Sequence, residues 1–113
     1  PSLYQAILKL PQSTEQLASL RVLVSSGEAL PKETAMKLMK IVPNSKLINL
    51  YGATEVSADS TCFEVPPTFE DDSVPIGTPI YNTNVAILDT HLREIPAGVL
   101  GKLYGLGDYV ASF

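Results

Sequence analysis

The run 47–55, Leu-Ile-Asn-Leu-Tyr-Gly-Ala-Thr-Glu, constrains the fold of this chain more than any other segment. Its first four residues include three large apolar side chains, which is typical of a short buried strand. We expect Gly52 to break that strand, and the polar pair Thr54 and Glu55 follows at once. Open α/β sheets bind ligands where their buried strands end. We therefore predict an α/β fold with a binding site at this strand end.

The polar end of this run offers groups that suit a nucleotide. A purine can stack on the ring of Tyr51, and Gly52 lets the backbone approach a ligand closely. The Thr54 hydroxyl can donate to a phosphate oxygen, and the Glu55 carboxylate is the hard oxygen ligand that Mg²⁺ prefers. From composition alone, a capped turn in which these two side chains bond to local amides is the favoured interpretation.

The segments before this run alternate between helical and strand-like patterns. We predict a helix over 2–10 capped by Ser2 and ended by Pro11, and a short helix over 14–19 with a capping box at Ser13-x-x-Gln16. A strand over 20–24, stopped by Gly27, and a helix over 32–41 follow. A strand, a helix and a second strand in this order favour a parallel pair of strands with the helix crossing over them.

The second half of the chain has a β-rich pattern. Residues 60–65 are compatible with a strand that Pro66-Pro67 must end, and the acidic loop 70–72 is expected to be solvated. The segments 84–89 and 99–104 predict a hairpin. We therefore predict an α/β portion over 1–57 and a β-rich portion over 58–113.

Composition excludes several classes of protein. The net charge is −4 and the eight basic residues are scattered, which argues against a nucleic-acid partner. The lone Cys62 excludes an internal disulfide and fits a reducing compartment. No apolar run is long enough to span a membrane, and no signal-peptide pattern opens the chain. We expect a cytoplasmic location and no membrane partner.

Three segments carry a family resemblance. The segment 49–55, Asn-Leu-Tyr-Gly-Ala-Thr-Glu, resembles the Asn-x-Tyr-Gly-x-Thr-Glu core motif of the adenylate-forming superfamily, which includes acyl-CoA synthetases and the adenylation domains of non-ribosomal peptide synthetases. Ser-Ser-Gly-Glu-Ala-Leu at 25–30 is similar to the Gly-Glu-Ala-Leu turn of that family, and 74–89 is similar to its Ile-Gly-x-Pro segment and the following strand. A fourth segment, 101–108, matches only in part, because Lys102 stands where the family has Glu.

The resemblance implies a fragment of the large N-terminal domain of an adenylate-forming ligase. The phosphate loop of the family is expected before residue 1, and its ribose-binding Asp and catalytic Lys after residue 113, so we expect the isolated chain to be inactive. The parent would use ATP and Mg²⁺ to convert a carboxylate into an acyl-adenylate. It would then pass the acyl group to CoA or to the phosphopantetheine arm of a carrier protein. A fatty or aromatic acyl-CoA ligase and a non-catalytic fragment stay open as alternatives.

The resemblance also implies roles for individual residues. With the full motif around them, ligand contact becomes the favoured interpretation of Thr54 and Glu55, with Thr54 at the α-phosphate and Glu55 holding Mg²⁺. Tyr51 would lie against the adenine, with Asn49 as a polar partner and Gly52 beside it. The opposite wall of the nucleotide site would be formed by Gly27, Glu28 and Ala29.

The resemblance places an acyl pocket beside the nucleotide. Its residues would be Val24, Ser26, Leu50, Ala58 and Asp59. Most of these make a small apolar pocket, but a buried carboxylate at Asp59 needs a partner, and a substrate ammonium would supply one. This set is similar to that of β-alanine-activating domains, so we predict a small amino acid, β-alanine first. The alternative is that Asp59 faces solvent or caps a turn.

Overall fold

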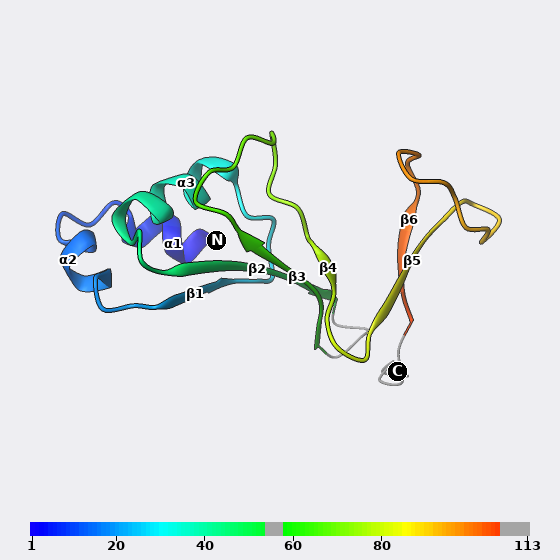
Figure 1. Cartoon of the computed structure of the whole chain (residues 1–113), viewed down its shortest axis with the longest axis horizontal. Coiled ribbons are helices and arrows are strands. Elements are labelled where there is room, and N and C mark those ends of the chain that lie inside the picture. Colours follow the sequence, from blue (N-terminus) through cyan, green and yellow to red (C-terminus); the bar gives the residue numbers. More distant parts are fainter. Residues whose placement is uncertain (54–57, 107–113) are drawn as a thin grey trace.

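The computed structural model describes residues 1–53 and 58–106, and it is mixed α/β (Figure 1). The elements are α1 (Ser2–Ile7), α2 (Ser13–Leu17), β1 (Val22–Ser25), α3 (Lys32–Ile41), β2 (Lys46–Ala53), β3 (Ala58–Val65), β4 (Thr78–Pro79), β5 (Asn84–Leu88) and β6 (Lys102–Leu106). None of the helices among these residues is long and apolar enough to cross a membrane.

The first sheet has the strand order β1-β2-β3-β4. β1 and β2 are parallel, from Val22 opposite Lys46 to Ser25 opposite Asn49, and α3 connects them. This confirms the predicted parallel pair and its crossover helix. β3 and β4 then continue the sheet in antiparallel order. The carboxyl ends of β1 and β2 therefore lie at the same edge of the sheet.

β2 is longer than the sequence pattern predicted. It continues through Gly52 to Ala53, so the prediction that Gly52 breaks the strand was wrong. The pairing with β3 shifts instead, because Tyr51 lies opposite Thr61 and Gly52 lies opposite Asp59. The extra residue on β3 makes a bulge, which bends a strand locally without ending it.

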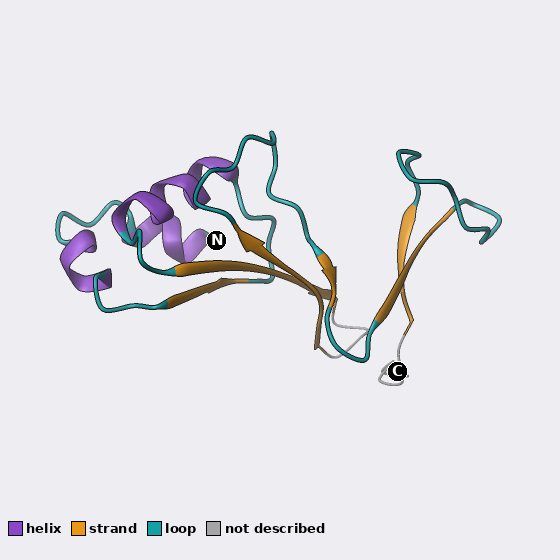
Figure 2. Ribbon diagram, viewed as in Figure 1, coloured by secondary structure: helices purple, strands orange, loops and turns teal. Residues whose placement is uncertain are grey.

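The helices pack on one face of this sheet (Figure 2). Leu23, Leu47 and Val65 point into that side and are at most 2% exposed, where they pack with buried residues of α3 such as Leu38. Successive side chains of a strand point to opposite faces. Val24, next to Leu23 on β1, is accordingly 48% exposed on the other face.

Helix ends differ from the sequence predictions. The N-cap of α1 is Pro1, and the Ser2 hydroxyl donates to the Glu28 carboxylate instead of capping the helix. α1 also ends at Ile7, before the predicted residue 10. Gln12 is the N-cap of α2, so the predicted capping box at Ser13 was wrong. α3 spans Lys32–Ile41 as predicted.

β5 and β6 form a separate two-stranded antiparallel sheet, which confirms the predicted hairpin (Figure 1). Its second strand begins at Lys102, three residues later than predicted. No described side chain of 84–105 is fully buried, and Leu100 is completely exposed. Among the residues whose burial the structure describes, the core lies in the part of the chain that precedes the hairpin.

Candidate functional site

A cavity of about 270 Å³ opens at the carboxyl ends of β1 and β2. One wall is the loop between β1 and α3, and the other is the second half of β2. The lining residues are Gly27, Glu28, Ala29, Leu30, Asn49, Leu50, Tyr51, Gly52, Val74 and Ile76. The structure thus brings together every predicted nucleotide-binding residue that it describes. Thr54 and Glu55 lie outside the described residues.

Gly27 turns the chain from β1 toward α3. Its φ is +82°, in the left-handed region that residues other than glycine rarely adopt. A Cβ atom placed there would meet no atom within 4 Å. The backbone conformation, and not a lack of space, therefore requires glycine at this wall of the cavity.

The Asn49 side chain has a buried acceptor atom that no described residue pairs with. Its side chain is 4% exposed, and its Nδ2 donates a 2.8 Å hydrogen bond to the carbonyl oxygen of Pro75. That bond fixes the orientation of the amide, while Oδ1 has no hydrogen-bond partner among residues 1–53 and 58–106. A buried polar atom without a partner is costly and uncommon in native proteins. The Asn49 side chain is therefore suited to accept a hydrogen bond from an N–H group of a ligand.

Tyr51 contributes an aromatic surface to the same cavity. It lies two residues after Asn49 on β2, so both side chains are on the same face of the strand. Tyr51 lines the cavity, and 39% of its surface is exposed. A flat ligand can therefore stack on its ring.

The segment that carries Val74 and Ile76 is a wall that the sequence predictions missed. The Asn49 side chain holds the Pro75 carbonyl, and the Thr61 hydroxyl donates a 2.6 Å hydrogen bond to the Ile76 carbonyl. Gly77 follows with a φ of +84°, and a Cβ atom there would overlap the backbone of Cys62. The Ile-Gly-x-Pro match was the signal that could have placed this segment beside β2.

A second cavity, of about 320 Å³, lies on the other side of the same loop. It is lined by Pro1, Ser2, Leu3, Tyr4, Val24, Ser25, Ser26, Gly27 and Glu28. Two of the predicted substrate residues, Val24 and Ser26, are among them. Tyr4 was not predicted, because nothing in the pattern of α1 shows which residue reaches β1.

Asp59 lies next to this second cavity. The Ser26 hydroxyl donates a 2.7 Å hydrogen bond to Asp59 Oδ1, and Asp59 is half-buried. Of the other predicted substrate residues, Leu50 lines the first cavity instead, and the side chain of Ala58 lies outside those described. The structure therefore joins Ser26 to Asp59 and places Val24 with Ser26 in the lining of the second cavity.

The described residues contain no group of three or more His, Cys, Asp or Glu side chains that could hold a metal ion. The predicted metal ligand, Glu55, is not among them. Its assignment to Mg²⁺ stays a prediction.

A parallel strand pair with its crossover helix and a cavity at the carboxyl ends is the ligand site of an open α/β sheet. The comparison with protein families agrees with that class. The model described as AMP-binding enzyme matches residues 1–112, and the chain belongs to this family. The superfamily predicted from the motifs is thereby confirmed.

Curated relatives are large synthases and synthetases. The chain is 40% identical over 117 aligned residues to indigoidine synthase of Dickeya dadantii, an alignment that covers 98% of this chain and 8% of that protein. It is 41% identical to vanchrobactin synthetase VabF of Vibrio anguillarum, with 82% of this chain and 3% of that protein covered. The chain therefore spans less than a tenth of the length of these relatives.

Solved structures share the fold. One is a holo NRPS protein containing adenylation and PCP domains, bound to a vinylsulfonamide inhibitor. It is 30% identical with a TM-score of 0.88, covering 98% of this chain and 19% of that one. Another is the N-terminal subdomain of NpsA from Klebsiella oxytoca in complex with 3-hydroxybenzoyl-AMSN, which is 23% identical with a TM-score of 0.82. That alignment covers 96% of this chain and 26% of the NpsA chain.

Proposed function

We propose that these residues form the central part of an adenylation domain that activates a carboxylate with ATP. A carboxylate oxygen attacks the α-phosphorus, the new acyl–phosphate bond forms, and the bond to the β-phosphate oxygen breaks to release pyrophosphate. The observation that carries this proposal is the first cavity, where the loop at Gly27 faces Asn49 and Tyr51. Membership of the AMP-binding enzyme family supports it independently.

The first cavity suits the adenosine part of ATP. Adenine can stack on the Tyr51 ring, and its exocyclic amine can donate to the unpaired Asn49 Oδ1. Gly27, Glu28 and Ala29 form the facing wall, and Gly52 lies beside the ring. Thr54 at the α-phosphate and Glu55 at Mg²⁺ complete the proposal; when bound, the metal ion would stabilise negative charge on the phosphates.

The proposed acceptor is the phosphopantetheine thiol of a carrier-protein domain. This choice over CoA is supported by a solved relative that contains both adenylation and PCP domains. The thiol sulfur attacks the acyl carbon, a thioester forms, and AMP leaves with the electron pair of the broken carbon–oxygen bond. We propose that the 113 residues alone do not turn over substrate. We also propose that the protein acts in the cytoplasm.

The proposed substrate is a small amino acid, with β-alanine first. Asp59 is half-buried, and its Oδ1 already accepts a hydrogen bond from Ser26. The second carboxylate oxygen can accept from a substrate ammonium, which compensates the cost of desolvating both charges. A fatty or aromatic acid offers no cation to Asp59, which makes acyl-CoA ligase activity the less favoured alternative.

The test is pyrophosphate–ATP exchange by the full-length protein with β-alanine, α-amino acids, fatty acids and aromatic acids. Exchange that depends on an added acid supports adenylation, and the highest kcat/KM with β-alanine supports the substrate. Absence of acid-dependent exchange with all four classes overturns the proposed function. Titration of the isolated 113 residues with ATP and Mg²⁺ separately tests whether nucleotide binding survives without turnover.

A further inference from the structure

α1 is attached to the wall that separates the two cavities. Gly27 and Glu28 line both of them. Two side chains of α1 reach this wall or the strand before it: the Ser2 hydroxyl donates to Glu28, and the Tyr4 hydroxyl donates a 2.7 Å hydrogen bond to the Val24 carbonyl at the end of β1. The position of the wall therefore depends on a helix that is about twenty residues earlier in the chain.

The Tyr4 bond acts on one side of the wall only. Tyr4 and Val24 both line the second cavity, and neither lines the first. Glu28, which receives the Ser2 bond, lines both. A change at Tyr4 is therefore expected to affect the acyl side of the site and to leave the nucleotide side in place.

Val24 is held by the pairing of β1 with β2, where it lies opposite Ile48, and by the bond from Tyr4. Its side chain is 48% exposed on the face of β1 that the helices do not cover. Among the described strands, β1 pairs with β2 alone, so β1 is an edge strand of the sheet. The Tyr4 ring packs against the hydrophobic core, and this packing holds the position of its hydroxyl. Burial raises the pKa of the Tyr4 phenol, so the hydroxyl stays protonated and able to donate.

We propose that Tyr4 is a positioning residue for the acyl pocket. Its hydroxyl holds the backbone of β1 at Val24, so that Val24 and Ser26 present a wall of fixed position to a small carboxylate substrate. This inference rests on the proposed function. It adds a determinant of substrate fit that comes from α1 and makes no contact with the reacting atoms.

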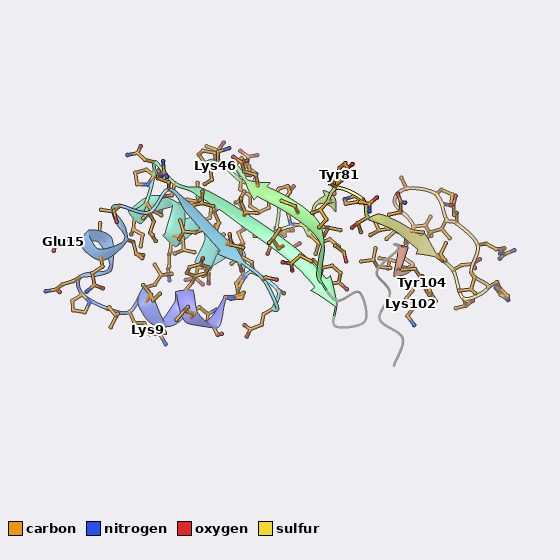
Figure 3. The ribbon with its side chains drawn as sticks, turned by 90° about the horizontal axis from the view of Figure 1, so that it is seen from below. Lys9, Glu15, Lys46, Tyr81, Lys102 and Tyr104 are labelled. Carbon is orange, nitrogen blue, oxygen red and sulfur yellow. The ribbon has the colours of Figure 1, made fainter. Side chains whose placement is uncertain are left out.

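The test is Tyr4→Phe in the full-length protein, assayed by pyrophosphate–ATP exchange. The variant keeps the ring and loses one hydrogen bond, so we expect the KM for the acid to rise about three- to tenfold. The KM for ATP should change by less than about twofold. Tyr81→Phe is the matched control, because the Tyr81 side chain lies on the surface (Figure 3), is 98% exposed and is not a lining residue of either cavity. An unchanged acid KM in Tyr4→Phe, or an equal rise in both KM values, overturns the inference.

A second measurement does not depend on the folding of Tyr4→Phe. Placing 3,5-difluorotyrosine at position 4 keeps the ring and the donor but makes the phenol more acidic. We expect the acid KM of this protein to rise with pH as the phenol ionises, while the ATP KM and the wild-type acid KM do not follow that curve. Identical pH profiles overturn the inference. Wild-type protein without acid-dependent exchange overturns the proposed function itself, so the two failures are distinguishable.

Discussion

The Ser26 hydroxyl and the Asp59 carboxylate are joined by a 2.7 Å hydrogen bond across 33 residues of sequence. Ser26 follows the end of β1, and Asp59 lies on β3 opposite Gly52 of β2. The bond therefore connects the loop of the candidate site to the third strand of the sheet. It also fixes one oxygen of the carboxylate, while the other accepts no hydrogen bond from the part of the chain that the structure describes.

Replacing Asp59 should separate an amino-acid substrate from other acids. Asp59→Asn keeps the shape and removes the charge, so a substrate ammonium loses a charge-assisted hydrogen bond worth about 1.5–3 kcal/mol. We expect kcat/KM for β-alanine in pyrophosphate exchange to fall about ten- to hundredfold, with the KM for ATP unchanged. Asp71→Asn, in the exposed acidic loop, is the control. Equal exchange by Asp59→Asn and wild type would remove the reason for choosing β-alanine.

Gly77→Ala should disrupt the wall of the first cavity that Val74 and Ile76 form. The new Cβ would overlap the backbone of Cys62 and would also force a side chain into a left-handed conformation. β4 begins at the next residue and pairs with β3, so the substitution displaces the sheet edge as well. We expect the free energy of unfolding to fall by at least about 3 kcal/mol, as measured by denaturant unfolding of the protein. An unfolding curve like that of wild type would contradict this packing.

Asp89 should make the turn after β5 sensitive to acid. The backbone N–H of Arg93, then its side chain and the N–H of His91, bond to the carboxylate and lower the pKa of Asp89. A lowered pKa in the folded state stabilises the fold above the unfolded-state value, about pH 4, and this stabilisation is lost as the pH falls through the folded-state value.

Asp89→Asn tests that dependence. Its thermal unfolding temperature should be lower than that of wild type at neutral pH, and the two should converge as the pH falls below the lowered pKa of Asp89. A difference that stays constant from neutral pH to acid would show that the charge of Asp89 does not stabilise this turn.

Local patterns predicted the elements that depend on local sequence. α3 has an amphipathic pattern, and its bounds agree with the sequence prediction because its buried face recurs at helical spacing. The hairpin of β5 and β6 was likewise visible from two apolar runs and a turn. The proposed nucleotide-binding residues that line the first cavity could be named because the motifs are contiguous in sequence; they are Gly27, Glu28, Ala29, Asn49, Tyr51 and Gly52.

Tertiary contacts decided the features that the patterns missed. β4 has only two residues and exists because β3 lies beside it. Gly52 stays in β2 because β3 accommodates a bulge opposite it. Ser2 does not cap α1, because the helix begins at Ser2 and Pro1 is its N-cap, and the Ser2 hydroxyl donates instead to Glu28, distant in sequence. Tyr4 reaches Val24 because α1 packs beside β1, and the spacing of residues in the sequence does not reveal this contact.

Gly27→Ala tests the wall that faces Tyr51. Gly27 and Gly98 both have a positive φ, and a Cβ atom at either would meet nothing within 4 Å, so alanine adds the same backbone strain of about 1–2 kcal/mol at each. Of these two glycines, Gly27 lines both cavities and Gly98 lines neither. We expect both variants to lose similar thermal stability and only Gly27→Ala to weaken ATP binding, because its methyl group and altered turn stand between the nucleotide and the backbone. Isothermal titration of the full-length protein with ATP measures the difference, and equal affinities in the two variants would show that the nucleotide does not approach this wall.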